Sequence, residues 1–273
     1  FYKIDYKKYN IYYKYNMSLS INLAASKIAG MVGMNPYYSV DEAKEELYCK
    51  VKKIKQRTLD DEKVLTSIEK EKIGAALLPN IDTTNMTLEN ILEVSCRDAI
   101  NTTTCDDSIK KEEILNKIIK EHVEDGKDTK LVSEFITSTI NKSRGIKNED
   151  KIIKDYNNKN QTYVTDNNSK FYRYKLFEDL KKYNINIVAK IDGLDKGCLI
   201  EVKNRRNRLF NKIVEYEKVQ LEIYLRILDI TDAKLVENYN NTFVEHIYTR
   251  DDNFWNLIKE RLYDFLDNFI DTL

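Results

Sequence analysis

Two acidic residues and a lysine stand among apolar residues in the segment IDGLDKGCLIEVKNRR, residues 191–206. Asp192 precedes a glycine-containing turn, and Glu201 and Lys203 flank Val202 in the apolar stretch that follows. Burying charged groups costs free energy unless a partner compensates, so this arrangement indicates chemistry. Carboxylates and a backbone carbonyl are hard oxygen ligands for Mg²⁺ or Mn²⁺, and a nearby ammonium group can hold a water molecule or a phosphate oxygen. The combination is suited to hydrolysing phosphodiester bonds.

The spacing of these residues predicts two strands joined by the turn GLDKG, residues 193–197. Side chains repeat every two residues along a strand, so Glu201 and Lys203 share one face and Val202 points to the other. The turn brings Asp192 back toward Glu201. We therefore predict a metal site formed by the two carboxylates and the Val202 carbonyl. The alternative is a salt bridge on the solvent face of a hairpin, because so short a pattern also arises by chance.

The organisation of the chain predicts how these strands are supported. Residues 39–141 have a helical, charge-rich pattern with breaks at 77–87, 101–107 and 124–130, and a short helix is expected from near Asn22 to Gly33. After Ser143 the pattern predicts a helix at 144–160, strands within 162–166, 170–178, 184–194 and 197–205, a helix at 209–230, strands at 233–239 and 242–249, and a last helix from Asp251. We expect one α/β domain over residues 1–273, with a tail (1–16), a helical N-terminal part (17–142) and a catalytic core (143–273).

Composition excludes several classes of protein. The 273 residues are 42% hydrophobic, enough for a core without disulfides. Four cysteines without a CxxC pair and two histidines argue against structural zinc and favour a reducing, intracellular setting. Lys+Arg and Asp+Glu number 45 each, so nucleic-acid binding would need local patches. No apolar run approaches the roughly 20 residues that span a bilayer, and we expect a soluble protein of the cytoplasm, or of a host cell's cytoplasm or nucleus if viral.

Asp192 and Glu201-Val202-Lys203 on successive strands resemble the core motif of the PD-(D/E)XK nuclease superfamily, and the chain resembles its lambda-exonuclease branch, also called YqaJ-type viral recombinases. Three further stretches carry the likeness. They match Gly145 with Glu149 in a first core helix, Gln220 with Tyr224 in a later helix, and Ala25-Ser26 with Asn35-Pro36-Tyr37 in an opening segment. Residues 40–141 are not matched. MSLSIN also lacks the arginine with which relatives engage a 5′ phosphate.

The resemblance implies an α/β fold with a restriction-endonuclease-like core, a mixed sheet flanked by helices, and a helical N-terminal elaboration. It also implies an Mg²⁺-dependent (or Mn²⁺-dependent) exonuclease that degrades double-stranded DNA ends from 5′ to 3′ in recombination, replication or repair. A single-strand annealing protein and further copies of the chain are the expected partners. The alternatives are a sequence-specific or structure-specific endonuclease and a DNA-binding module with a decayed site.

Two further polar residues are expected in the site. Glu149 shares a helix face with Ile152, Ile153 and Tyr156, which indicates a metal ligand or an orienting group. The alternative is a carboxylate favoured by the helix N-terminus. Gln220 would orient a water molecule or Lys203, and the alternative is an amide satisfied within the core.

Nucleic-acid contacts are expected on both sides of the site. The basic run after the catalytic strand would bind backbone phosphates, because such contacts need charge and no sequence readout. The alternative is a solvated basic segment, or arginines paired with the acidic helices of residues 41–72. At the start of the short N-terminal helix, a serine and a lysine would contact a phosphate or cap the helix. The expected contact residues are Ser26, Lys27, Asn204, Arg205, Arg206, Arg208 and Tyr224.

Overall fold

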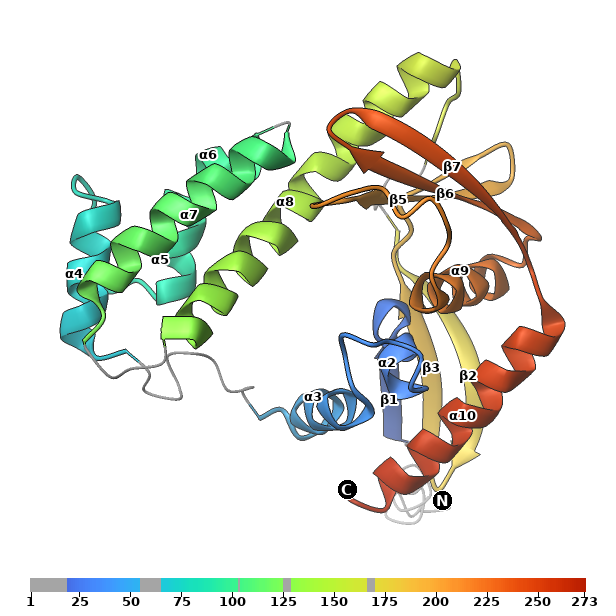
Figure 1. Cartoon of the computed structure of the whole chain (residues 1–273). Coiled ribbons are helices and arrows are strands. Elements are labelled where there is room, and N and C mark those ends of the chain that lie inside the picture. The colour runs from blue at the N-terminus through green and yellow to red at the C-terminus, as the bar shows by residue number, and fades with distance from the viewer. Residues whose placement is uncertain (1–18, 55–64, 103, 125–128, 166–169) are drawn as a thin grey trace, which may run out of the picture.

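The computed structural model describes residues 19–54, 65–102, 104–124, 129–165 and 170–273, so the tail 1–16 lies outside it. Figure 1 shows two parts, a lobe of helices and a mixed α/β part, joined along the long helix α8 (Thr129–Asn160). The mixed α/β fold with a helical elaboration is confirmed, although the strands form two sheets instead of one. Among the described helices, none has the length and apolar character needed to cross a membrane.

The first sheet has the strand order β1-β3-β2 (Leu19–Ala24, Tyr183–Ala189 and Tyr172–Leu180). Strand β1 runs parallel to β3, and β2 runs antiparallel to it. The helix predicted from near Asn22 is therefore wrong at its start, because only η1 (Ala25–Lys27) and α2 (Ile28–Met31) are helical. Ile21 and Leu23 alternate with less buried neighbours, which is the period of a strand. The segment was too short for its period to be clear from sequence.

The second sheet has the order β4-β5-β6-β7 (Gly193–Asp195, Cys198–Asn204, Asp232–Tyr239 and Thr242–Thr249). Strands β5 and β6 are parallel, and helix α9 (Glu215–Leu228) connects them. The helix predicted at 209–230 begins later, because the backbone N–H groups of Phe210 and Asn211 donate to the Glu237 carboxylate at 3.1 and 2.9 Å. In place of a strand at 162–166, the described residues have a single bridge between Thr165 and Leu194.

The main hydrophobic core lies where α9 meets both sheets. Ile185 and Ile187 of β3, Val219 and Ile223 of α9, and Leu262 of α10 (Asp252–Ile270) are fully buried there. Helices α2 and α3 (Val40–Lys52) pack against the same core. Because β3 leads to Asp192 and α9 carries Gln220, this core fixes the strand before one site residue and the helix that carries another.

The helical lobe has a separate core and consists of α4 (Ser67–Leu77), α5 (Leu88–Ser95), α6 (Arg97–Asn101), α7 (Cys105–His122) and the first half of α8. Three of its helices, α4, α5 and α7, are capped by Thr66, Thr87 and Thr104, whose side chains accept backbone N–H groups. The three predicted breaks are confirmed. Helix α8 continues through residues 142 and 143, and its second half packs Ile152, Ile153 and Tyr156 against the second sheet.

Candidate active site

The hairpin of β4 and β5 places Asp192 beside the middle of β5. Gly193 pairs with Ile200, and the turn uses positive φ values at Lys196 (48°) and Gly197 (82°), which glycine adopts without strain. The backbone N–H of Val202 donates to Asp192 Oδ2 at 2.7 Å. This hydrogen bond brings the Asp192 carboxylate to the strand that carries Glu201, as the turn GLDKG predicted.

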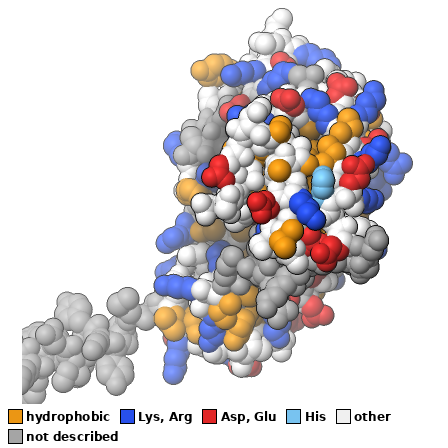
Figure 2. Space-filling model, turned by 90° about the vertical axis from the view of Figure 1, so that its left-hand side faces the viewer, with side chains coloured by type: hydrophobic (Ala, Val, Ile, Leu, Met, Phe, Trp, Pro, Cys, Tyr) orange, Lys and Arg blue, Asp and Glu red, His pale blue; other side chains and the backbone are white. Residues whose placement is uncertain are grey.

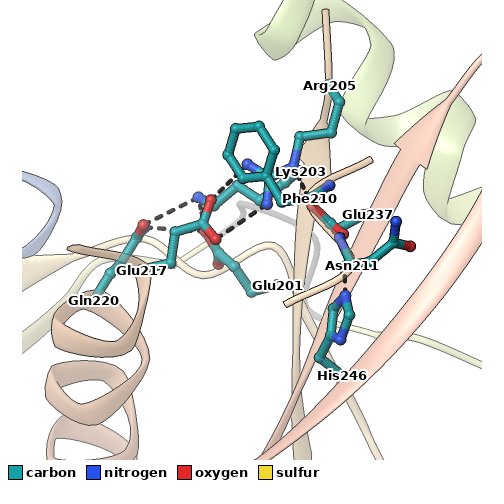
Figure 3. A network of polar contacts seen from close by, with 9 residues as sticks. All are labelled: Glu201, Lys203, Arg205, Phe210, Asn211, Glu217, Gln220, Glu237 and His246. Carbon is teal, nitrogen blue, oxygen red and sulfur yellow. Dashed lines mark hydrogen bonds and ion pairs between the residues drawn. The ribbon is translucent and has the colours of Figure 1, made fainter. Parts of the chain in front are cut away.

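Glu201, Lys203 and Gln220 form a closed set of hydrogen bonds (Figure 3). Lys203 Nζ lies 2.7 Å from Glu201 Oε1 and 3.0 Å from Gln220 Oε1. Gln220 Nε2 in turn donates to Glu201 Oε1 at 3.0 Å and approaches the Tyr224 hydroxyl at 2.8 Å. Gln220 therefore orients both the lysine and the glutamate, which is the contact predicted for it with Lys203.

The site concentrates negative charge away from water. Asp192 is 8% exposed and Glu201 is 3% exposed. Burial raises the pKa of the Glu201 carboxyl, and the charge of Asp192 raises it further. Burial also raises the pKa of Asp192, against the opposing effect of Lys203. Burial alone would lower the pKa of Lys203, but the Glu201 and Asp192 carboxylates outweigh it and raise that pKa, so the ammonium stays charged.

One atom of the site lacks a protein partner. Glu201 Oε2 is buried and no N–H or hydroxyl donor reaches it, while the Glu201 carboxyl meets the Asp192 carboxyl in a contact that lowers the pKa of Asp192. An unpaired buried carboxylate oxygen beside a second carboxylate fits a divalent cation, because the cation would satisfy the oxygen and offset the repulsion between the two acids. Within the described residues, no group of three or more His, Cys, Asp or Glu side chains is arranged to hold a metal ion. A cation here would depend on Asp192, Glu201, backbone oxygen and water.

Glu149 approaches the same site from α8. Ile152, Ile153 and Tyr156 of its helix face are buried against the second sheet, as the periodicity predicted. Glu149 is half-buried, and its charge contributes to the raised pKa of Asp192. The helix that links the two parts of the molecule therefore brings a third carboxylate toward Asp192, just before β4, and Glu201 of β5.

The phosphate contact predicted for Arg205 does not fit the structure. Its guanidinium is buried and pairs with Glu237 through Nε at 2.6 Å, and with Glu217 through NH1 and NH2 at 2.6 and 3.0 Å (Figure 3). The Phe210 ring covers it, 4.1 Å from Cζ. A phosphate would have to displace two carboxylates, so Arg205 has a structural role.

The other two arginines of the run differ from each other. Arg206 pairs with both Glu112 oxygens at 2.8 Å, so its acidic partner lies on α7 and not in the helices of residues 41–72. Arg208 is exposed and remains available for a phosphate. Asn204, at the end of β5, accepts a hydrogen bond from Asn238 at 3.2 Å.

The remaining predicted contact residues have mixed surroundings. Tyr224 is 5% exposed and its hydroxyl meets Gln220, so it belongs to the interior of the site and cannot stack on a nucleic acid. Ser26 is exposed, but the residue at the cap of η1 is Ala24, without a side-chain hydrogen bond. Lys27 pairs with Glu46 at 2.8 Å and lies over the Tyr38 ring at 4.5 Å, which engages its charge within the protein.

Three residues near the site were not predicted from the sequence. Glu217 and Glu237 hold Arg205, and His246 approaches Glu237 Oε2 at 3.0 Å. The signal that could have found them was the one that identified Glu201, an acidic residue within an apolar strand, and Glu237 in AKLVENY has it. On the face of the molecule drawn in Figure 2, the basic and acidic side chains of the described residues are interspersed.

The sequence matches no protein-family model and no curated protein. Among solved structures, the chain is similar to an alkaline exonuclease, LHK-Exo, from Laribacter hongkongensis, with 14% identity, a TM-score of 0.39, and coverage of 65% of this chain and 86% of the other. It is also similar to a phage-related exonuclease from Haemophilus somnus 129PT, with 13% identity, a TM-score of 0.36, and coverage of 76% and 94%. Likeness at these TM-scores assigns no function, so a function has to come from the site itself.

Proposed function

We propose that this protein is a metal-dependent nuclease of the PD-(D/E)XK type that hydrolyses phosphodiester bonds in DNA. The observation that supports it is the buried pair Asp192 and Glu201, with Glu201 Oε2 unpartnered and the Lys203 ammonium 2.7 Å from Oε1. In ion pairs with a structural role, the buried oxygens normally all have hydrogen-bond donors. Glu201 Oε2 has no such donor and could bind a cation. A bound Mg²⁺ or Mn²⁺ would activate water and polarise the phosphate.

The side chains around the pair have separate roles in this proposal. Asp192 and Glu201 would hold the cation with the Val202 carbonyl, and Glu149 would act at that cation through water. Lys203 would stabilise the negative charge that develops on the phosphate in the transition state. Gln220 fixes the position of Lys203 through its 3.0 Å hydrogen bond.

Within this function we propose an exonuclease that acts on double-stranded ends from 5′ to 3′. Support comes from the order of four sequence motifs, from the Ala25-Ser26 segment to Gln220 and Tyr224. The basic residue expected before Ala25 is missing from MSLSIN, so the recognition of a 5′ phosphate has to be tested directly. A role in DNA recombination, replication or repair would follow from resection of such ends.

The test uses linear duplex DNA labelled at one 5′ or 3′ end, together with covalently closed circles, in Mg²⁺ and in chelator. We expect the linear DNA to be degraded from its 5′ ends in Mg²⁺ and the circles to stay intact. Asp192→Asn should abolish hydrolysis. Asp195→Asn, in the same hairpin, is the matched control and should retain it. Cleavage of the circles would show that the protein is an endonuclease and not an exonuclease. If the parent protein hydrolysed no substrate, the proposed nuclease function would be contradicted.

A further inference from the structure

A groove of about 1070 Å³ lies beside the candidate active site and contains none of its acidic residues. One rim is the N-terminal segment 33–37, and the other lies within residues 208–216, which lead from β5 into the first turn of α9. The side chains that line it are largely aromatic, amide and basic, with Glu215 as the single acidic one. Those that carry the argument are Tyr37, Tyr216, Arg208, Lys212 and Phe210.

The groove offers aromatic rings and positive charge together. The Tyr37 side chain projects into solvent, with the residue 80% exposed, and its ring meets the Tyr216 ring edge-on at 6.1 Å. Arg208 and Lys212 are exposed on the opposite rim. An aromatic ring at such exposure costs free energy in water and gives a flat surface for a nucleobase, while the two cations suit phosphates.

Both rims are held in place by contacts within the protein. Glu237 accepts the N–H groups of Phe210 and Asn211 at 3.1 and 2.9 Å, and the buried guanidinium of Arg205 lies 4.1 Å from the Phe210 ring. On the other rim, Asn35 Oδ1 accepts the N–H of Tyr37 at 2.9 Å and fixes the turn that presents the tyrosine. A binding surface formed in advance loses less entropy when a ligand arrives.

The groove is contiguous with the catalytic residues through α9. Tyr216 lies one helical turn before Gln220, and the neighbouring Glu217 binds Arg205 two residues beyond Lys203 in β5 (Figure 3). The positive charge of Lys203 acts on the Tyr216 hydroxyl, so the wall of the groove that Tyr216 forms lies close to the Lys203 ammonium.

We propose that this groove binds single-stranded nucleic acid next to the bond that is cut, with bases stacked on Tyr37 and Tyr216 and phosphates held by Arg208 and Lys212. The proposal rests on the nuclease function of the adjacent site. Unpaired bases are the favoured occupant, because the faces of bases in a duplex are already stacked and closed to a tyrosine. Two cations opposed by the acidic Glu215 would also neutralise fewer phosphates than binding to a duplex backbone requires.

The experiment measures binding of a fluorescent single-stranded oligonucleotide in chelator, where hydrolysis cannot contribute. We expect Tyr37→Ala to weaken binding about tenfold, the effect of losing one stacked base. The double variant Arg208→Gln, Lys212→Gln should reduce the salt dependence of binding, with the log-log slope falling by about 0.7 for each phosphate that the protein no longer neutralises. The matched controls are Tyr163→Ala, at a tyrosine that is 79% exposed outside the groove, and Arg97→Gln on α6. Both should bind as the parent does.

Several outcomes would overturn the proposal. Tyr37→Ala binding as the parent does would remove the stacking surface, and an unchanged salt slope in the double variant would remove the phosphate contacts. If Tyr37→Ala lost affinity equally for a duplex with closed hairpin ends, the ligand of the groove would be a duplex and not a single strand. Hydrolysis is scored separately. An inactive parent that still binds through Tyr37 contradicts the nuclease alone, whereas an active parent with unaffected binding in the variants contradicts the groove alone.

Discussion

Two clusters of buried charge, one at Glu201 and Lys203 of β5 and one at Arg205 just after this strand, differ in how completely they are paired. Arg205 uses Nε, NH1 and NH2 to bind Glu237 and Glu217, and Glu237 also binds His246 and two backbone N–H groups. Glu201, in contrast, leaves Oε2 without a partner and faces the second carboxylate of Asp192. The first cluster stabilises the fold, and the second has a carboxylate oxygen that could bind a ligand.

The pKa of a buried glutamate shifts in opposite directions in the two clusters. Burial acts against the ionised form of both glutamates. For Glu237, hydrogen bonds from His246 and the Phe210 N–H, together with the Arg205 charge, outweigh burial and lower the pKa. For Glu201, burial and the Asp192 charge outweigh Lys203 and raise it. Burial therefore does not decide the state of an acid on its own, because the surrounding donors do.

The largest expected effect is on activity. Glu201→Gln should reduce Mg²⁺-dependent hydrolysis about a thousandfold or more, because the amide cannot supply the charge that holds the cation. The free energy of unfolding should change little, because relief of the repulsion with Asp192 offsets the loss of the ion pair with Lys203. A nuclease assay and urea unfolding of the same preparation measure both. Activity within tenfold of the parent would contradict the role of Glu201.

Arg205→Gln, which breaks the fully paired cluster, should instead have its main effect on stability. Its removal leaves Glu217 and Glu237 buried without their cation, which we expect to lower the free energy of unfolding by about 3–5 kcal/mol. Urea unfolding measures the loss. Arg208→Gln, at an exposed arginine three residues away, is the control and should change stability by less than about 0.5 kcal/mol. Equal stability of the two variants would show that the buried pairs are not what secures this segment.

Lys203→Ala tests whether metal binding and transition-state stabilisation depend on different residues of the Glu201 cluster. We expect turnover to fall about a hundredfold, the effect of losing one group that stabilises transition-state charge. The rise in melting temperature on addition of Mg²⁺ should persist, because an ammonium group is not a metal ligand. Glu201→Gln provides the contrast, since it should lose the Mg²⁺ effect. A loss of that effect in Lys203→Ala as well would make the lysine a structural part of the metal site.

The smallest expected effect is the dependence of metal-free stability on pH. The folded state raises the pKa values of Asp192 and Glu201 above those of the unfolded chain, so between these values the folded state binds more protons. Stability from this pair is therefore present at low pH and lost as pH rises above about 4, the ordinary carboxyl range. The double variant Asp192→Asn, Glu201→Gln should lack this loss. Urea unfolding across pH without metal gives the difference, and parallel pH curves would contradict the raised pKa values.

Sequence alone determined the local geometry of the site. Alternation along β5 places Glu201 and Lys203 on one face, and the turn at Gly193–Gly197 returns Asp192 to them, because both features depend on residues close in the chain. The helix breaks followed from local signals in the same way, with threonines capping the next helices. The helical periodicity also placed the right face of α8 against the sheet.

Only the tertiary structure decided which basic residues are free. Arg205, Arg206 and Arg208 look alike in sequence, but Glu237 and Glu217 bury the first, Glu112 on α7 binds the second, and the third remains exposed. Strand β1 likewise became visible only through its pairing with β3. Such partners are distant in the chain, and Glu112 precedes Arg206 by 94 residues. The electrostatic free energy of a charge depends on the groups that surround it in space, which the order of residues along the chain does not specify.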